Sequence, residues 1–360
     1  MTTLTAGLEL RPLHVPTSID APDAADFRDM VRLRNLIYAE ISGHDDGSMP
    51  ADELLPMYQP KPDMKRYAWI VVFHGEVVGR VGLEFPQEEG ARTGFWHIDL
   101  RRSAWGHGIG RTAFALIESV AREEGRSVLQ AWAEHPAVEG PQVAAPTGFG
   151  AIPEDHAARF FLASGNTLEQ IVRVSALDLE GSRPNLESLL AAAEGAAAGY
   201  RVVQWTLPTP DEFVDAFAWM KSRMVTDAPS AGLEFDEEVW DAARLRRYER
   251  DYLDAGRHLL VTAAQHVDTG ELAAFNELVI GKDRAAATHQ EDTLVVASHR
   301  GHRLGMLVKC AGLLAWHEVA PDSPRVITYN AEENRPMLSI NEEIGFRPLS
   351  YEGVWKKVLD

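Results

Sequence analysis

The residues best suited to chemistry in this sequence form a short basic loop, Arg300-Gly301-His302-Arg303-Leu304-Gly305. A β-branched run over 293–296 precedes the loop, and apolar residues at helical spacing follow it from Met306. A strand, a turn and a helix in this order direct backbone N–H groups outward at the positive end of a helix dipole. Glycines let the main chain come close to an anion. With two arginines beside these N–H groups, the loop predicts a pyrophosphate-binding site.

The loop and the segments after it resemble the GNAT superfamily of acyl-CoA-dependent N-acyltransferases. Arg300 and Gly305 match the first and last positions of that family's loop, and Arg303 stands where many members have glycine. The following strand, 325–330, and the helix 334–346 with its closing Gly-Phe also resemble the family. A βα unit that binds some other phosphate is the alternative interpretation.

The same motif occurs a second time, as Trp105-Gly106-His107-Gly108-Ile109-Gly110. Aligning Gly106 with Gly301 gives an offset of 301 − 106 = 195, and the hairpin over 67–85 then aligns with 259–279. Residues 131–134 are similar to 329–332. A repeat of this length indicates two copies of one fold. The expected fold class is α/β (α+β), with two tandem GNAT-like domains, each a mostly antiparallel mixed central sheet flanked by helices.

The expected boundaries are an N-terminal domain over 1–180, a linker helix over 181–199 and a C-terminal domain over 200–360. Turn residues and hydrophobic periodicity predict the elements within them. The predicted strands are 8–13, 67–73, 76–85, 95–100, 201–206 and 325–330, and the predicted helices include 24–41, 156–164, 210–227, 234–254 and 334–346. A Pro- and Gly-rich loop is expected over 136–155.

The family resemblance implies that acyl-CoA binds along the strand and the phosphate loop. In the C-terminal copy the implied cofactor-binding residues are Val295, Val296, Arg300, Gly301, His302, Arg303, Leu304, Gly305, Met306, Asn330 and Asn334. In the N-terminal copy they are Leu100, Trp105, Gly106, His107, Gly108, Ile109 and Gly110. The first copy has Trp105 in place of Arg300, and the alignment pairs Trp132 with Asn330. These two replacements favour turnover in the C-terminal copy, as in tandem members of the superfamily such as mycothiol synthase.

Transfer of an acyl group to an amine needs a general base, and a carboxylate or imidazole on the central strands of the second copy is expected. Glu277 is the first candidate, with a solvated strand residue as the equally weighted alternative. His289 and Glu291 follow, because alternate strand residues should share a face with Thr293 and Val295.

The family often places a tyrosine as general acid just before the end of the last helix. Asn341 stands there in this sequence, and Phe161 stands at the counterpart, and neither side chain protonates a thiolate. Tyr329 and Tyr351 are possible replacements, or the thiolate leaves without assistance.

Composition restricts the class of protein. A net charge of −19 disfavours nucleic acid and anionic membranes as partners, and permits a cationic substrate. A single cysteine, Cys310, excludes a disulfide framework and a Cys-rich zinc site, so no metal site is expected. No apolar run is long enough to span a membrane and the N-terminus lacks a signal-peptide pattern, so a cytoplasmic location is expected. A monomer or homodimer is expected.

The resemblance implies an acetyl-CoA-dependent N-acetyltransferase that acts on a primary amine of a small molecule, such as an aminoglycoside-like antibiotic or an aminosugar, and hence a role in antibiotic resistance. Two alternatives stay open. One is a mycothiol-synthase-type acetylation of a thiol-precursor amine. The other is a non-catalytic acyl-CoA sensor, or pseudoenzyme, because the tyrosine is missing from both copies.

Overall fold

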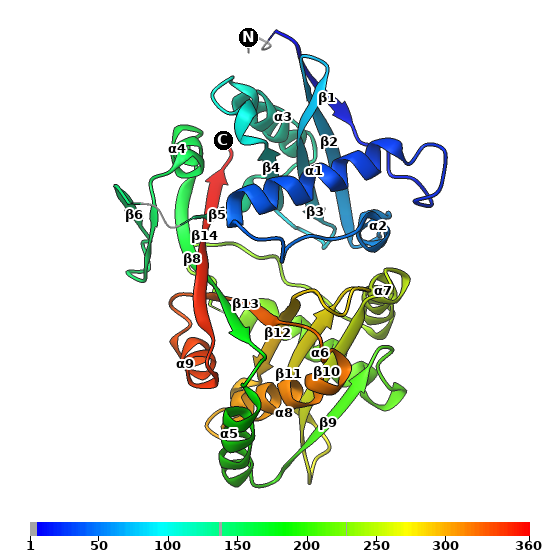
Figure 1. The fold of residues 1–360 in the computed structure, drawn as a ribbon, viewed down its shortest axis with the longest axis vertical. Coiled ribbons are helices and arrows are strands. Elements are labelled where there is room, and N and C mark those ends of the chain that lie inside the picture. The colour runs from blue at the N-terminus through cyan, green and yellow to red at the C-terminus, as the bar shows by residue number, and fades with distance from the viewer. Residues whose placement is uncertain (1–5, 137–138, 228) are drawn as a thin grey trace. The chain divides into compact units, whose positions relative to one another are not determined.

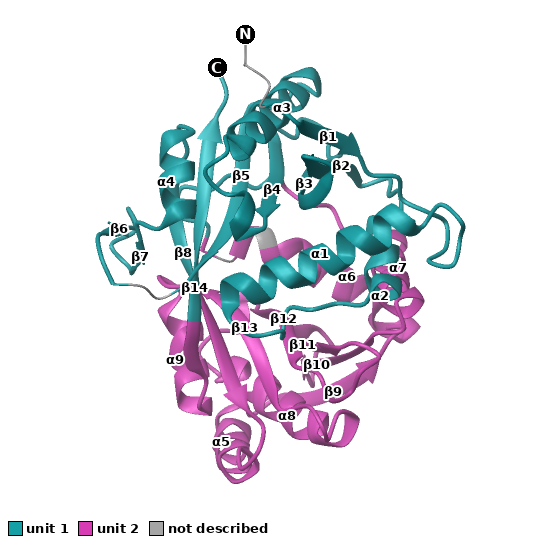
Figure 2. Ribbon diagram, turned by 45° about the horizontal axis from the view of Figure 1, so that its top comes forward, with its two compact units in different colours: residues 1–172, 230–236, 350–360 teal, residues 173–229, 237–349 magenta. Residues whose placement is uncertain are grey.

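The computed structural model describes residues 6–136, 139–227 and 229–360. The chain forms two compact units, which Figure 2 shows in two colours. Unit 1 comprises Met1–Val172, Ser230–Asp236 and Ser350–Asp360, and unit 2 comprises Arg173–Pro229 and Glu237–Leu349. Each unit therefore takes up segments that are distant in the sequence.

Unit 1 is a mixed sheet with helices on both faces (Figure 1). Its strands are β1 (Leu8–Pro12), β2 (Met64–Phe73), β3 (Glu76–Pro86), β4 (Thr93–Leu100), β5 (Val128–His135) and the unit 1 parts of β14 (Arg347–Val358) and β8 (Thr167–Asp178). They neighbour one another in the order β1-β2-β3-β4-β5-β14-β8, and the β4–β5 pair is parallel. Its helices are α1 (Ala25–Ser42), α2 (Ala51–Tyr58), α3 (Ile109–Glu123) and α4 (His156–Ala163). A small hairpin, β6 (Gln142–Ala144) and β7 (Ala151–Pro153), lies within the predicted loop 136–155, of which residues 137 and 138 lie outside the described residues.

Unit 2 repeats this plan. Its strands are β9 (Tyr200–Thr206), β10 (His258–His266), β11 (Leu272–Ile280), β12 (Thr288–Val295) and β13 (Arg325–Ala331), followed by the unit 2 part of β8. Neighbouring strands from β9 to β12 pair antiparallel, and β12 pairs with β13 in parallel. Its helices are α5 (Arg183–Ala196), α6 (Val214–Asp227), α7 (Ala242–Asp254), α8 (Leu304–Val319) and α9 (Arg335–Ile344).

Two apolar layers define the faces of the unit 2 sheet. Helices α6 and α7 cover one face, where Phe217 and Leu245 pack with Phe275 and Leu294. Helices α5 and α8 cover the other face, and here residues of β10 and β11 such as Ala274 and Leu278 contact Leu186, Leu307 and Trp316. We call these the α6/α7 face and the α5/α8 face. Because side chains alternate along a strand, neighbouring residues of one strand serve different faces.

The mixed, mostly antiparallel fold class and its tandem arrangement are confirmed. The boundaries 1–180, 181–199 and 200–360 stay a prediction, and α5 lies inside the predicted linker. The compact units differ from these ranges, because residues 230–236 and 350–360 belong to unit 1. The latter segment pairs with β5 over Tyr351–Val358.

The predicted helix over 234–254 is wrong in its first third. Helix α7 begins at Ala242, where the side chain of Asp241 accepts a hydrogen bond from the N–H of Arg244 at 2.7 Å. Residues 234–240 form neither helix nor strand, and Leu233 just before them is buried against Val172 and Val354, all three within unit 1. Tertiary packing overrides the local helical pattern here.

Candidate active site

Strands β12 and β13 separate after a short paired start. They pair only at Thr288 with Val326 and at His289 with Ile327. Beyond these residues both strands continue without pairing to each other, as far as Val295 and Ala331. Their facing backbone groups are therefore available to an extended ligand between the two strands. We call this opening the fork of unit 2.

A β-bulge lies on the fork side of β12. Thr293 pairs with Asn276 and Gln290 pairs with Leu278, so three steps along β12 match two steps along β11. The extra residue lies at Glu291 or Asp292. A bulge leaves backbone groups of the extra residue outside the ladder and turns its side chain in a new direction.

The bulge also corrects a sequence inference about His289. Regular alternation places His289 on the face of Thr293 and Val295. The pairing of His289 with Val279 instead places it on the α6/α7 face, whereas Val295 pairs with Ala274 on the α5/α8 face. The alternation fails because one extra residue moves the side chains that precede it in β12 to the opposite face of the sheet. Glu291 is exposed at this point of the strand.

Glu277, on β11, belongs to a buried ionic cluster on the α6/α7 face. Its side chain is fully buried, and one oxygen lies 3.0 Å from Lys221 Nζ. The same Nζ lies 2.6 Å from Asp292 of the bulge. Burial raises the pKa of Glu277 to about 7, against the lowering effect of Lys221. The other carboxylate oxygen, Oε1, is buried without a hydrogen-bond partner among the described residues.

Lys221 holds the two carboxylates together. Burial alone would lower the pKa of Lys221, but the charges of Asp292 and Glu277 raise it well above its ordinary value. Nζ also lies 4.5 Å from the centre of the Tyr248 ring, and burial raises the pKa of that phenol. Lys221 is therefore a permanent cation, and the carboxylates share its charge. Neither Lys221 nor Asp292 was predicted from the sequence. Regular alternation singled out Glu291 rather than Asp292.

The phosphate loop of unit 2 has the backbone that the motif predicts. Gly301 has a φ of 92°, and Arg303 is the N-cap residue of α8 with a φ of 53°. A left-handed backbone conformation is uncommon for an arginine. At the equivalent position of unit 1 (303 − 108 = 195), Gly108 adopts the same conformation with a φ of 76°. The first backward hydrogen bond of α8 runs from the N–H of Leu307 to the carbonyl of Arg303 at 3.0 Å. The N–H groups just before Leu307 are the unpaired donors of a helix N-terminus, as anion binding requires.

The side chains of the loop differ in accessibility. Arg300, His302 and Arg303 are exposed, and Arg303 forms an ion pair with Glu343 at 3.0 Å. Arg300 Nε donates to the carbonyl of Val295 at 3.3 Å. The other predicted cofactor-binding side chains of this region are buried in the core or form a helix cap, and these are Val296, Leu304, Met306 and Asn334. Leu304 and Met306 therefore have only their backbone to offer a ligand.

A second buried lysine lies on α8, next to the fork. Lys309 is fully buried, and its Nζ lies 2.8 Å from the Oδ1 of Asn341 on α9. Asn341 Nδ2 in turn donates to Asn330 Oδ1 on β13 at 2.7 Å. Burial lowers the pKa of Lys309 to about 7. Asn330 and Asn341 were both singled out from the sequence, whereas Lys309 was not.

The sheet face on which each side chain lies also corrects the alignment of β5 in unit 1 with β13 in unit 2. Leu129 and Val326 each pack under the helix that follows the phosphate loop of their own unit, so the structural offset is 326 − 129 = 197. This offset aligns Trp132 with Tyr329, which are 37% and 45% exposed. Asn330 then aligns with Ala133. The sequence alignment had paired Asn330 with Trp132, and that pairing is wrong.

The loop of unit 1 keeps the backbone but not the charge. Trp105 Nε1 donates to the carbonyl of Leu100 at 3.1 Å, as Arg300 does to Val295. The Trp105 ring stacks on His156 at a centroid distance of 4.3 Å. Gly106, His107 and Gly108 are exposed, Ile109 is buried, and Gly110 lies close to Phe160. An indole supplies one donor and no charge.

Unit 1 also lacks the carboxylate and the bulge. Gly82 stands at the position of Glu277 (277 − 82 = 195), because Leu83 and Leu278 are equivalent core residues of the two hairpins. Strands β3 and β4 pair without a register shift, and Gly82 faces His97. Burial lowers the pKa of His97 to about 4, so that its imidazole is neutral at physiological pH. Unit 1 therefore has no counterpart of the Glu277–Lys221–Asp292 cluster at this position.

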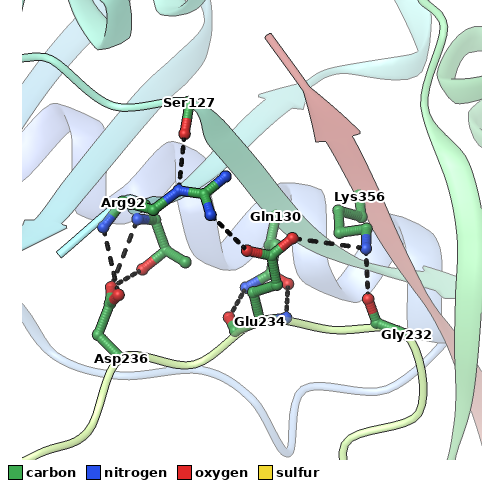
Figure 3. A network of polar contacts seen from close by, with 8 residues as sticks. Arg92, Ser127, Gln130, Gly232, Glu234, Asp236 and Lys356 are labelled. Carbon is green, nitrogen blue, oxygen red and sulfur yellow. Dashed lines mark hydrogen bonds and ion pairs between the residues drawn. The ribbon is translucent and has the colours of Figure 1, made fainter.

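Residues 230–236 cover the start of the fork in unit 1 (Figure 3). The Gln130 side chain donates to the carbonyl of Glu234 at 2.7 Å and accepts from its N–H at 2.8 Å. The Asp236 carboxylate accepts hydrogen bonds from the N–H groups of Arg92 and Thr93. Phe235 stacks on Phe95, with 6.3 Å between ring centroids. Phe95 and Gln130 are the last residues at which β4 and β5 pair, so the segment lies where these two strands separate.

Comparisons with known proteins agree with this geometry. The sequence profile of the Acetyltransferase (GNAT) family matches residues 31–139. A solved tandem GNAT protein from the clavulanic acid biosynthesis pathway is 26% identical, with a TM-score of 0.72 and coverage of 98% of both chains. The chain has the fold of a tandem GNAT acetyltransferase. A GCN5-related N-acetyltransferase from Sphaerobacter thermophilus shares its fold at 14% identity, with a TM-score of 0.61, covering 99% of this chain and 97% of its own. None of the curated proteins matches the sequence.

The residues present in unit 2 of this tandem GNAT protein fit an acyl-CoA. The outward N–H groups at the start of α8, with Arg300 and Arg303 beside them, suit a pyrophosphate. The backbone of Val295, in the part of β12 that does not pair with β13, suits an extended amide chain. The thioester supplies an activated acyl group when bound. Among the described residues, no group of three His, Cys, Asp or Glu side chains is arranged to hold a metal ion. The described helices include none that is long and apolar enough to span a membrane.

Proposed function

We propose that the C-terminal copy transfers an acetyl group from acetyl-CoA to a primary amine of a small molecule. The observation that carries this proposal is the carboxylate of Glu277, buried next to the fork with a pKa of about 7 and one unpaired oxygen. A group with such a pKa accepts a proton from an ammonium at physiological pH and releases it again. Glu277 is therefore the proposed general base.

Lys221, Asp292 and the backbone of the β12 bulge have different roles in the proposed reaction. Lys221 fixes the Glu277 carboxylate through one oxygen and leaves Oε1 as the proton acceptor. Asp292, whose side chain is 38% exposed at the bulge, extends the same cluster toward solvent and provides a route for the proton. The backbone of the bulge supplies N–H groups outside the ladder, which suit a developing oxyanion.

The acceptor is proposed to be a cationic small molecule. Glu291 and Asp292 place two carboxylates at the bulge of β12, and the chain as a whole carries a net charge of −19. Such a field attracts ammonium groups. An aminoglycoside or an aminosugar has this chemistry, and a thiol-precursor aminosugar is a third member of the class. The tandem relative from the clavulanic acid pathway, which is 26% identical, leaves all three open.

The N-terminal copy is proposed to support the fold and not to turn over. Three features support this division. Gly82 replaces the carboxylate, β4 has no bulge, and residues 230–236 cover the start of the unit 1 fork. The loop of unit 1 keeps its outward N–H groups, so CoA binding in both copies agrees with the proposal.

The test is thiol release from acetyl-CoA across a panel of amines. Glucosamine and an aminoglycoside are compared with glucose, which has the sugar ring of glucosamine without the amine. The only cysteine, Cys310, is buried, so a thiol reagent reads released CoA against a low background. Release with an amine and none with glucose supports the proposal. Binding of acetyl-CoA without release for any amine favours the sensor function instead.

A further inference from the structure

Neither copy has a tyrosine at the position where the family's general acid often stands, yet unit 2 has a buried lysine behind that position. Lys309 exposes 0% of its surface, although lysine is rarely buried without an anionic partner. Its ammonium donates to the amide oxygen of Asn341 at 2.8 Å, and no carboxylate contacts it among the described residues. Glu343, the nearby acid on α9, is paired with Arg303 at the surface. Burial of such a charge is costly and asks for a functional reason.

The two amides continue from Lys309 to the fork. Asn341 Nδ2 donates to Asn330 Oδ1 at 2.7 Å, and Asn330 lies in the part of β13 that has separated from β12. The Nδ2 donors of Asn330 have no partner within the described chain, and the residue is only partly buried. All three residues belong to unit 2. The ammonium, the first amide and the second amide are thus aligned head to tail toward the fork.

We propose that Lys309 is a positioning residue that, through Asn341 and Asn330, stabilises the thiolate of departing CoA in place of a general acid. This inference rests on the proposed function. Hydrogen bonds in a chain polarise one another. A thiolate at Asn330 favours the protonated form of Lys309, and this charge makes the terminal Asn330 N–H a stronger donor. The C–S bond breaks with its electron pair on sulfur, the amine proton goes to Glu277, and the thiolate accepts the Asn330 N–H without receiving a proton. Carboxamides do not relay protons, so the effect is electrostatic.

The test is the ionisation of the CoA thiol bound to the protein, which needs neither an acceptor nor turnover. The ultraviolet absorbance of the thiolate is followed against pH for CoA bound to the wild type and to Lys309→Met, a neutral chain of similar length. Burial raises the pKa of Cys310 to about 12, so this thiol stays silent through the titration. The difference between the two proteins reports on the C-terminal copy alone, because Lys309 lies there.

In the wild type the bound thiol is expected to ionise below the range of ordinary thiols, and in Lys309→Met its ionisation constant should fall at least tenfold. If Lys309→Met does not fold, Asn330→Leu gives the same readout, since Asn330 is partly exposed and its loss leaves the Lys309–Asn341 bond in place. Equal thiol ionisation in folded wild type and variant would overturn the inference and leave the proposed function standing. Failure of CoA to bind the wild type would overturn the proposed function first.

Discussion

Lys221 Nζ lies 3.0 Å from one carboxylate oxygen of Glu277, and the other oxygen of the same carboxylate has no partner among the described residues. A buried ion pair usually has its remaining lone pairs satisfied by further hydrogen bonds. Here half of the carboxylate is left unsatisfied, although the cluster is fully buried on the side of β11. Unsatisfied, pKa-shifted carboxylates are typical of functional sites.

Replacement of Glu277 by glutamine should lower kcat by a factor on the order of 10² or more, because a general base contributes at least that much. The KM for acetyl-CoA should change little, since the side chain lies away from the phosphate loop. In the wild type kcat should rise with pH through about 7, as Glu277 loses its proton. Steady-state kinetics with the amine found in the panel measure both effects, with exposed Glu318→Gln as the matched control. A wild-type kcat in a folded Glu277→Gln protein would exclude this base.

Replacement of Arg300 by alanine should weaken acetyl-CoA binding about tenfold, the effect of losing one charge-assisted bond to a phosphate. The free energy of unfolding should stay unchanged, because Arg300 is exposed and its one bond is to a backbone carbonyl. Calorimetric titration with acetyl-CoA measures the affinity, and Arg250→Ala, an exposed arginine on α7, is the control. Equal affinity in both variants would remove Arg300 from the site.

Replacement of Asp236 by alanine should destabilise unit 1 by about 1–3 kcal/mol, since it leaves the N–H groups of Arg92 and Thr93 without their acceptor. Residues 230–236 should then exchange their amide hydrogens faster. Urea denaturation and hydrogen exchange measure the two effects, and Glu237→Ala, one residue further on, is the control. Unchanged exchange over 230–236 would mean that other contacts hold the segment.

Glu352 and Glu134 are directly opposite each other on β14 and β5. Burial, and then the charge of Glu134, raise the pKa of Glu352 to about 7 from its ordinary value of 4.5. Protonated Glu352 therefore stabilises unit 1 fully below the unfolded pKa, and this stability is lost as the pH rises through about 7. Replacement by glutamine should raise the free energy of unfolding above that pH by about 1–3 kcal/mol. Denaturation on either side of this range should show the gain growing with pH. A constant difference would contradict the shift.

Sequence reasoning predicted the two copies, the glycine-bearing turns before α3 and α8 and most element boundaries, because glycine positions and periodicity are local signals. It failed where tertiary structure decides. The bulge in β12 moved His289 to the other face, and no periodicity predicts one inserted residue. Residues 234–240 have a helical pattern in the sequence but no helix in the structure, where Leu233 just before them is buried within unit 1. The ion cluster of Lys221 and the buried Lys309 depend on residues far apart in the chain, and only the fold brings them together.

The central claim is that the C-terminal copy performs the chemistry. Glutamate at Gly305 is a poor probe, since a Cβ there would lie 2.9 Å from Ile340 and disturb the packing of α8 on α9. His302 and His107 are exposed at equivalent positions of the two loops (302 − 107 = 195), so glutamate places an anion in each loop without filling a core gap. The decisive measurement compares the acetyl-transfer rates of folded His302→Glu and His107→Glu. We expect His302→Glu to lose most of the wild-type rate and His107→Glu to keep most of it. If the folded His107→Glu variant has no acetyl-transfer activity and the His302→Glu variant keeps the wild-type rate, the account is contradicted and the chemistry belongs to the N-terminal copy.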